Sequence, residues 1–215
     1  MGNESVRVFE SEFQKKHPSW EPLSPSFFLE NTVSVAERLL GTLLRVKERD
    51  SDQFTCVRIV ETEAYSADDP ASHSYRGITP RCAPMFETGG IAYVYFIYGM
   101  YEMLNFVTEP ADRAGAVLIR GAELVEGELW LQRRRKSSLK KEWLNGPGRL
   151  TQALGVQMSD NREGLFGPRF RLYRDGFYPH MVARSSRIGI KKAVDRKWRF
   201  YIEGSPGVSR MPKPS

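Results

Sequence analysis

The chain has 215 residues, 40% of them hydrophobic and 27% charged, which is typical of a folded globular protein and excludes disordered, collagen-like and coiled-coil chains. No apolar run approaches the ~20 residues of a membrane-spanning helix, and the first twenty residues lack the apolar segment of a secretory signal. The 32 basic and 26 acidic residues give a net charge of +6, which favours an anionic partner such as nucleic acid. Cys56 and Cys82 have no metal-ligand spacing, so we expect reduced thiols in a cytoplasmic protein.

The composition along the chain predicts one domain with short flanking segments. In chain order these are a flexible N-terminal arm (1–24), a folded domain (25–210) and a C-terminal tail (211–215). Inside the domain, Asn31 or Ser34 could cap a helix through Leu40 that Gly41 ends.

Beyond this helix the pattern is mostly extended. Residues 43–46 and 54–65 flank a charged turn and predict a hairpin. Residues 68–89 are rich in Pro, Gly, Ser and Asp and predict a long functional loop. Further strands are predicted at 90–98, 101–108, 115–120, 170–173, 186–190 and 198–203, and helices at 126–135 and 146–154. Strands dominate without a βαβ rhythm, so the predicted fold class is α+β, with a curved, mostly antiparallel sheet flanked by helices.

The second strand of the first hairpin carries two carboxylates. Alternation places Val57, Ile59, Glu61, Glu63 and Tyr65 on one face, so that the acids continue an apolar row. Mutual repulsion and partial burial would raise a carboxyl pKa and suit a general base. The alternative is a strand that leaves the core with its last acids in solvent, and the pattern alone favours this alternative.

Five aromatic side chains fall within residues 93–101. Tyr98 directly precedes Gly99, which permits a tight turn, so Tyr98 would stand at the tip of a protruding β-hairpin, and Tyr93 and Tyr95 share a face. Aromatic residues also fill ordinary strands because they pack well on a pleated surface. On a basic protein, however, an aromatic wedge can enter a base stack, and aromatic faces can clamp an extruded base.

Short motifs that occur in a fixed order carry a family resemblance. They are VETEAY at 60–65, HS at 73–74, TPR at 79–81, MF at 85–86, YVY at 93–95, YGM at 98–100, Asn105, VLIR at 117–120, GP at 146–147, RIGI at 187–190 and GSP at 204–206. Together they resemble the alkyladenine (3-methyladenine) DNA glycosylase family of base-excision repair, over about residues 27–209. The resemblance implies a monomeric, single-domain enzyme without metal or organic cofactor. Such an enzyme flips alkylated or deaminated purines, such as 3-methyladenine, 7-methylguanine, hypoxanthine and ethenoadenine, out of duplex DNA and leaves an abasic site.

The resemblance also implies catalytic roles. Glu63 matches the glutamate that activates the attacking water, and Arg120 and the backbone carbonyl of Ile188 match groups that help to hold this water. Cleavage of an N-glycosidic bond passes through an oxocarbenium-like sugar. A carboxylate beside that sugar can accept the proton of the water and stabilise the developing positive charge.

DNA-binding roles follow in the same way. Tyr65, His73 and Tyr95 match the walls of the base pocket, Asn105 matches a residue that hinders guanine, and Tyr98 matches the side chain that fills the gap left by the flipped nucleotide. Among the basic residues, the expected phosphate contacts are Arg81, Arg149, Arg187 and Lys191, although any one of them could instead belong to a solvated surface.

Two substitutions depart from the family pattern: Gly121 stands where alanine is more usual, and Gly207 where tryptophan is common. Two other functions are weighed against the glycosylase. One is a non-catalytic DNA-binding module that keeps the tyrosine wedge, against which Glu63 and Arg120 together argue. The other is a glycosidase of free nucleosides, against which the basic charge argues.

Overall fold

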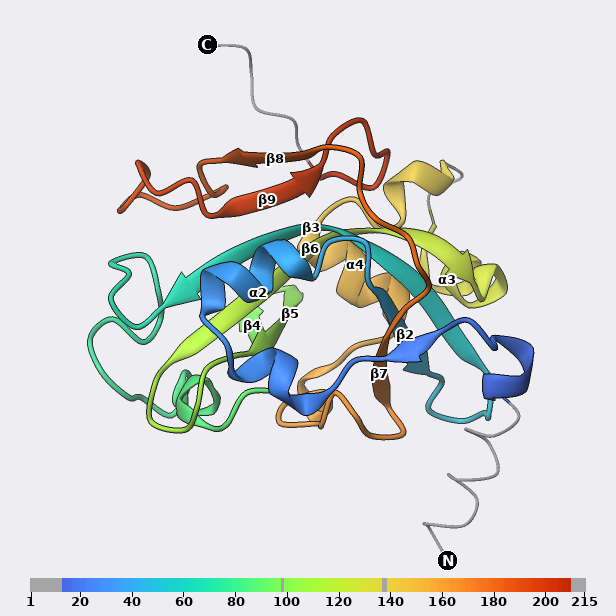
Figure 1. Ribbon diagram of the computed structural model, residues 1–215, viewed down its shortest axis with the longest axis horizontal. Helices are drawn as coiled ribbons and strands as arrows, with labels where there is room; N and C mark the ends of the chain where they lie inside the picture. The colour runs from blue at the N-terminus through green and yellow to red at the C-terminus, as the bar shows by residue number, and fades with distance from the viewer. Residues whose placement is uncertain (1–12, 98, 137–138, 210–215) are drawn as a thin grey trace, which may run out of the picture.

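The computed structural model describes residues 13–97, 99–136 and 139–209. Within these residues, nine strands form one antiparallel sheet in the order β1-β7-β2-β3-β6-β5-β4, and β9 and β8 extend it beside β3 (Figure 1). The strands are β1 (Glu21–Pro22), β2 (Leu43–Lys47), β3 (Phe54–Ser66), β4 (Ala92–Ile97), β5 (Tyr101–Val107), β6 (Gly115–Glu126), β7 (Phe170–Arg174), β8 (Val182–Ser185) and β9 (Arg199–Ile202). This confirms the α+β class and the antiparallel sheet.

The helices are short and begin and end with recognisable signals. They are α2 (Thr32–Arg38), α3 (Glu128–Arg134) and α4 (Pro147–Leu154), with 3₁₀ turns η1 (Pro25–Leu29), η2 (Ala83–Phe86), η3 (Lys140–Glu142) and η4 (Met158–Asp160). Asn31, one of the two predicted caps, caps α2 by accepting the Val33 N–H at 3.0 Å. Gly155 ends α4 in the left-handed conformation (φ +60°).

The two faces of the sheet have different environments. Helices α2 and α4 cover the same face, where residues such as Leu39 and Leu150 join apolar side chains of β3, β4, β5 and β6 in the main core. Figure 1 shows both helices on the side of β3 and β6 that faces away from the β8–β9 hairpin. Residues of β4, β5 and β6 that alternate with the core residues point to the opposite, loop-covered face, where the segments 70–73 and 188–192 and the 3₁₀ turn η2 lie over the sheet.

A β-bulge at Val60 changes which residues of β3 face the core. Ile59 and Glu61 pair with consecutive residues of β6, so Val60 is an extra residue. Before the bulge, odd-numbered residues such as Ile59 join the main core. After it, even-numbered residues do, and the Thr62 hydroxyl donates to the Ala36 carbonyl of α2 at 2.7 Å. The predicted continuous apolar row is therefore wrong. The bulge turns three side chains to the loop-covered face: Glu61, Glu63 and Tyr65.

The predicted arm is wrong for its second part, residues 13–24. Phe13 and Trp20 are buried against Tyr173 of β7, with ring centroids 5.2 and 5.9 Å from it, and β1 pairs with β7. These aromatic residues stand among polar residues without strand or helix periodicity, so the alternation pattern did not reveal their burial. Residues 1–12 and the predicted tail at 211–215 lie outside the described residues.

The strand predicted at 186–190 is also misplaced. The strand of this region is β8, which ends at Ser185 and pairs with β9, and the following residues form a bend with Gly189 at φ +80°. β6 runs six residues beyond its predicted end because it pairs with β3 along most of its length.

Candidate active site

The loop-covered face of the sheet carries one row of cross-strand neighbours. Tyr93 of β4 pairs with Asn105 of β5, Asn105 with Leu118 of β6, and Leu118 with Glu63 of β3. Above this row lies a cavity of about 510 Å³, which the sheet lines on one side and the segments 70–73 and 188–192 on the other. This volume is within the ~300–1,000 Å³ range of small-molecule sites.

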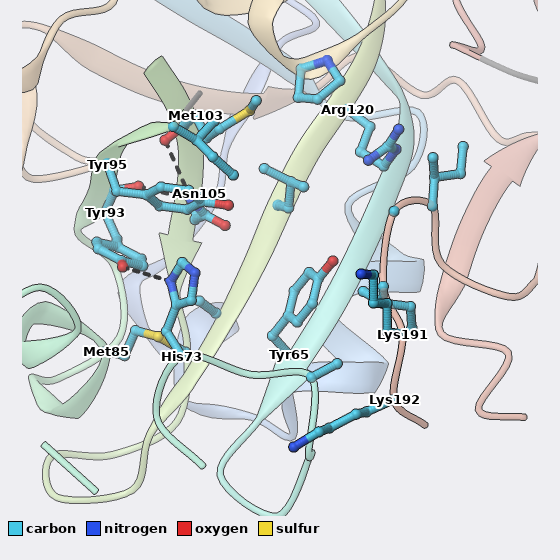
Figure 2. A pocket seen from close by; sticks show the side chains of 18 of the residues that line it. Tyr65, His73, Met85, Tyr93, Tyr95, Met103, Asn105, Arg120, Lys191 and Lys192 are labelled. Atoms are coloured by element: carbon cyan, nitrogen blue, oxygen red, sulfur yellow. Dashed lines mark hydrogen bonds between the residues drawn. The ribbon is translucent and has the colours of Figure 1, made fainter. Parts of the chain in front are cut away.

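Aromatic rings form the walls of this cavity (Figure 2). The His73 ring meets Tyr95 edge to face at 4.7 Å, and the Tyr93 and Tyr95 centroids are 5.3 Å apart. Nδ1 of His73 is 3.0 Å from the Tyr93 hydroxyl. Tyr65 projects into the cavity from β3 on the other side. The structure thus brings together the predicted pocket residues and adds Tyr93, whose alternation with Tyr95 was the available sequence signal.

His73 is held in its neutral form. Burial, reinforced by the positive charge of Arg81, lowers the pKa of His73 to about 4. At neutral pH the ring is therefore an uncharged hydrogen-bonding group of the cavity wall.

Asn105 lies buried at the base of the cavity between β4 and β6. Its Nδ2 donates to the Tyr93 carbonyl at 3.1 Å and to the Met103 carbonyl at 3.4 Å. Because the backbone takes both amide hydrogens, the side chain offers its carbonyl oxygen to a bound molecule.

Glu63 is fully buried beside the cavity and is covered by three residues that line it. Its Oε1 accepts the Ile188 N–H at 2.7 Å, and its Oε2 accepts the Tyr65 hydroxyl at 2.8 Å. Arg120 Nη1 stands 3.4 Å from Oε2. The expected grouping of Glu63, Arg120 and Ile188 is present, with the Ile188 N–H donating to the carboxylate. The water-holding role expected of the Ile188 carbonyl stays a prediction.

Glu61 is equally buried, but only one of its hydrogen-bond partners, Arg120, lines the cavity. Its Oε1 accepts from Arg199 Nε at 2.7 Å and Arg120 Nε at 3.0 Å. Ser209 donates its N–H to Oε2 at 2.6 Å and its hydroxyl to Oε1 at 2.9 Å. Sequence reasoning gave Glu61 no separate role.

These environments move the pKa values of the two carboxyl groups apart. Burial raises the pKa of Glu63, and Arg120 and the two hydrogen bonds do not fully offset it. Burial acts on Glu61 as well, but Arg120, Arg199 and the Ser209 N–H outweigh it and lower the pKa of Glu61. Opposite shifts in two neighbouring carboxyl groups are a pattern by which active sites separate the roles of two acids.

The structure corrects the expectation for Arg187, which is buried and therefore does not reach a phosphate. Its guanidinium pairs with Asp69, donates to the Ala64 carbonyl at 2.8 Å and lies 4.7 Å from the centroid of the Tyr65 ring. It thereby joins the 67–73 and 186–192 loops, which cover the cavity.

The other expected phosphate contacts are accessible. Arg81, Arg149 and Lys191 are exposed, and Lys191 lines the cavity mouth. Tyr98, the expected wedge, lies outside the described residues. Its neighbours Phe96 and Met100 are 49% and 65% exposed, so this end of the β4–β5 hairpin faces solvent.

The two glycines that depart from the family pattern lie against each other. A Cβ on Gly121 would stand 2.3 Å from the Gly207 carbonyl oxygen and 3.1 Å from Glu61 Oε2. The absence of both side chains lets the 204–209 segment approach β6, which brings Ser209 to Glu61.

We therefore expect Gly121→Ala to displace this segment and to lower the free energy of unfolding by about 1–3 kcal/mol, as overpacking does. Urea denaturation measures the effect. Gly164→Ala is the control because a Cβ there has no neighbour within 4 Å. Equal stability of the two variants would contradict the close approach.

Among the described residues, no three His, Cys, Asp or Glu side chains gather as a metal would require, and no helix has the length and apolarity to cross a membrane.

An aromatic cavity beside a buried carboxylate and an arginine can bind a flat ring and activate water next to it, as a hydrolase of a ring-bearing substrate requires. Comparison with known proteins specifies the class. The family model described as methylpurine-DNA glycosylase (MPG) matches residues 26–206. The chain belongs to this family, and is accordingly a DNA glycosylase, which hydrolyses N-glycosidic bonds of damaged bases in base-excision repair.

The sequences of individual relatives align with this chain along most of their length. A protein of Chlorobium luteolum is 43% identical over 190 residues, which cover 87% of this chain and 96% of the relative. Proteins of Salinibacter ruber and Methanoculleus marisnigri are each 43% identical, over 88% and 87% of this chain and 97% and 98% of their own lengths. All three are provisionally named 3-methyladenine DNA glycosylase.

Proposed function

We propose that this enzyme is a monomeric, monofunctional glycosylase that flips damaged purines out of double-stranded DNA into the aromatic cavity and leaves an abasic site. The substrates we propose are 3-methyladenine, 7-methylguanine, hypoxanthine and ethenoadenine. The observation that carries the proposal is the position of the buried Glu63 carboxylate directly beside a cavity of suitable size with aromatic walls.

In the proposed reaction Glu63 is the general base. A water that approaches from the cavity replaces the Tyr65 hydroxyl on the Glu63 carboxylate, and Arg120 and the Ile188 backbone orient it. As the C1′–N bond breaks with its electron pair going to the base, the water oxygen bonds to C1′ and its proton passes to Glu63. The carboxylate also stabilises the positive charge that develops on the sugar.

The cavity walls account for the proposed range of substrates. Tyr65 and Tyr95 stack on a purine without reading its edges, and an aromatic face attracts a cationic N-alkylated base by about 0.5–2 kcal/mol. Such bases are also better leaving groups. The Asn105 amide is fixed near the floor by its hydrogen bonds to two backbone carbonyls, and we propose that the side chain hinders guanine sterically, through contact with the exocyclic amine.

Binding to DNA requires groups outside the cavity. We propose that Arg81, Arg149 and Lys191 contact phosphates, since all three are exposed and Lys191 lies at the cavity mouth. Tyr98 is proposed to enter the gap left by the flipped nucleotide, in keeping with the exposure of the adjacent Phe96 and Met100. Extrusion of a base costs a few kcal/mol, which such an inserted ring offsets in part.

Excision from defined duplexes tests this function. Duplexes with one hypoxanthine, ethenoadenine or 7-methylguanine are incubated with the enzyme and then treated with alkali, which cleaves at abasic sites. We expect strand breaks at the damaged base and none in the undamaged duplex. Binding without breaks on all three duplexes would indicate a non-catalytic binding module, and faster cleavage of free nucleosides would indicate a nucleoside hydrolase.

A further inference from the structure

Glu61 has no place in the reaction proposed above, yet it is the most extensively bonded carboxylate near the site. It is fully buried, and of its partners Arg120, Arg199 and Ser209 only Arg120 lines the cavity, whereas all three partners of Glu63 do. Its oxygens accept hydrogen bonds from Arg199, Arg120 and the N–H and hydroxyl of Ser209. A carboxylate that is bonded in this way can act only through its neighbours.

The neighbour it shares with Glu63 is Arg120. The Arg120 Nε–H group donates to Glu61 at 3.0 Å, while Nη1 reaches Glu63 at the longer distance of 3.4 Å. Nη2 points to the Ser209 hydroxyl at 3.3 Å. The guanidinium is thus held on three sides and cannot turn to form a bidentate pair with Glu63, the geometry in which an arginine binds a carboxylate most strongly.

We propose that Glu61 is a positioning residue for Glu63: it holds Arg120 in an orientation that lets the guanidinium touch Glu63 without neutralising it. The inference rests on the proposed role of Glu63 as general base. It explains why β3 buries two carboxylates and not one.

The charges around Glu63 give the sign of the effect. The groups around it are Glu61 and Tyr65 on β3, Arg120 on β6, Arg187 and the Ile188 N–H from the 186–192 segment, and Arg199 of β9, which is its backbone partner and whose guanidinium pairs with Glu61. Burial and, more weakly, the negative charge of Glu61 raise the pKa of Glu63, whereas Arg120 lowers it. Loss of the Glu61 charge therefore lowers the pKa of Glu63, and loss of a nearby positive charge raises it.

Two variants test this proposal, because they should shift the acid limb of the pH–rate profile in opposite directions. In Glu61→Gln, we expect the acid limb of kcat/KM on a hypoxanthine duplex to move to lower pH by about one unit, the lower end of the effect of one adjacent charge. The plateau rate should fall because Glu63 becomes a weaker base. In Arg199→Gln the limb should move to higher pH, because the loss of a positive charge beside the two carboxylates raises the pKa of Glu63. Structural damage alone would not reverse the direction.

Glu48→Gln is the matched control. Glu48 is a buried carboxylate that pairs with Arg134 and accepts from the Thr55 hydroxyl at 3.0 Å. Its loss should lower Tm and leave the acid limb in place. Carboxyl-carbon NMR of Glu63 in the same variants reports its pKa without any turnover.

The outcomes distinguish the positioning role of Glu61 from the proposed role of Glu63 as general base. An unmoved limb and an unmoved Glu63 resonance titration in Glu61→Gln would overturn the positioning role. If Glu61→Gln does not fold, a limb in Arg199→Gln that stays or moves to lower pH does the same. Full activity of Glu63→Gln would instead overturn the proposed function, because the limb would then not belong to Glu63.

Discussion

Replacement of Glu63 by glutamine should abolish excision while the variant still binds lesion-containing duplex. Glutamine keeps the shape of the side chain: its carbonyl oxygen can still accept the Ile188 N–H, and its amide nitrogen can donate to the Tyr65 oxygen, but it cannot take a proton from water. General-base catalysis contributes about 10²- to 10⁴-fold, and we expect a loss of at least this order in single-turnover excision. Gel-shift measurements on an ethenoadenine duplex report the binding.

The stability of the same variant provides the control. Because burial raises the pKa of Glu63, the folded protein binds this proton more tightly than the unfolded chain does. The ionised carboxylate therefore costs stability as the pH rises from its unfolded pKa through its folded pKa. Glutamine removes this cost, so Tm at neutral pH should not fall. A variant that loses excision, binding and Tm together would show that Glu63 is a structural residue.

Replacement of Arg187 by methionine should cause the largest loss of stability. Asp69 and Arg187 pair with both side chains fully buried, and Asp69 Oδ1 accepts from Nη2 at 2.9 Å. Removal of one partner leaves a buried carboxylate uncompensated, which costs about 3–5 kcal/mol. Urea denaturation measures the change.

A double variant, Asp69→Asn with Arg187→Met, should recover part of this loss because no unpaired charge remains. Arg184→Met is the matched surface control. Arg184 pairs with Glu37 at 2.8 Å with its side chain 58% exposed, and such pairs contribute about 0–1 kcal/mol. Similar losses in Arg187→Met and Arg184→Met would contradict the role of burial.

The sequence predicted those features that depend on local chemistry. The cap at Asn31, the β2–β3 hairpin and the shared face of Tyr93 and Tyr95 follow from side-chain type and spacing, and the structure confirms them. The grouping of Glu63 with Arg120 came from the family resemblance and not from periodicity.

Features that depend on tertiary contacts were not predictable in this way. The bulge at Val60 leaves no mark on the alternation because β3 is buried on both sides of it. The burial of Arg187 depends on Asp69, which lies 118 residues away in the sequence. The sequence alone does not distinguish a surface arginine from one in a buried ion pair, because only the fold brings the distant partner into contact.

The bulge in β3 also has a consequence for how the enzyme can vary. After Val60, side chains of even number pack under α2, and those of odd number lie on the cavity side, where we propose that they serve catalysis. Thr62 and Ala64 can thus be exchanged to repack the interior while the reaction chemistry stays constant, and the acids can be altered without disturbing the helices. A deletion of one residue at this point would reverse the two sets. The carboxylates would then point into the apolar core, and Thr62 and Ala64 would point to the cavity side.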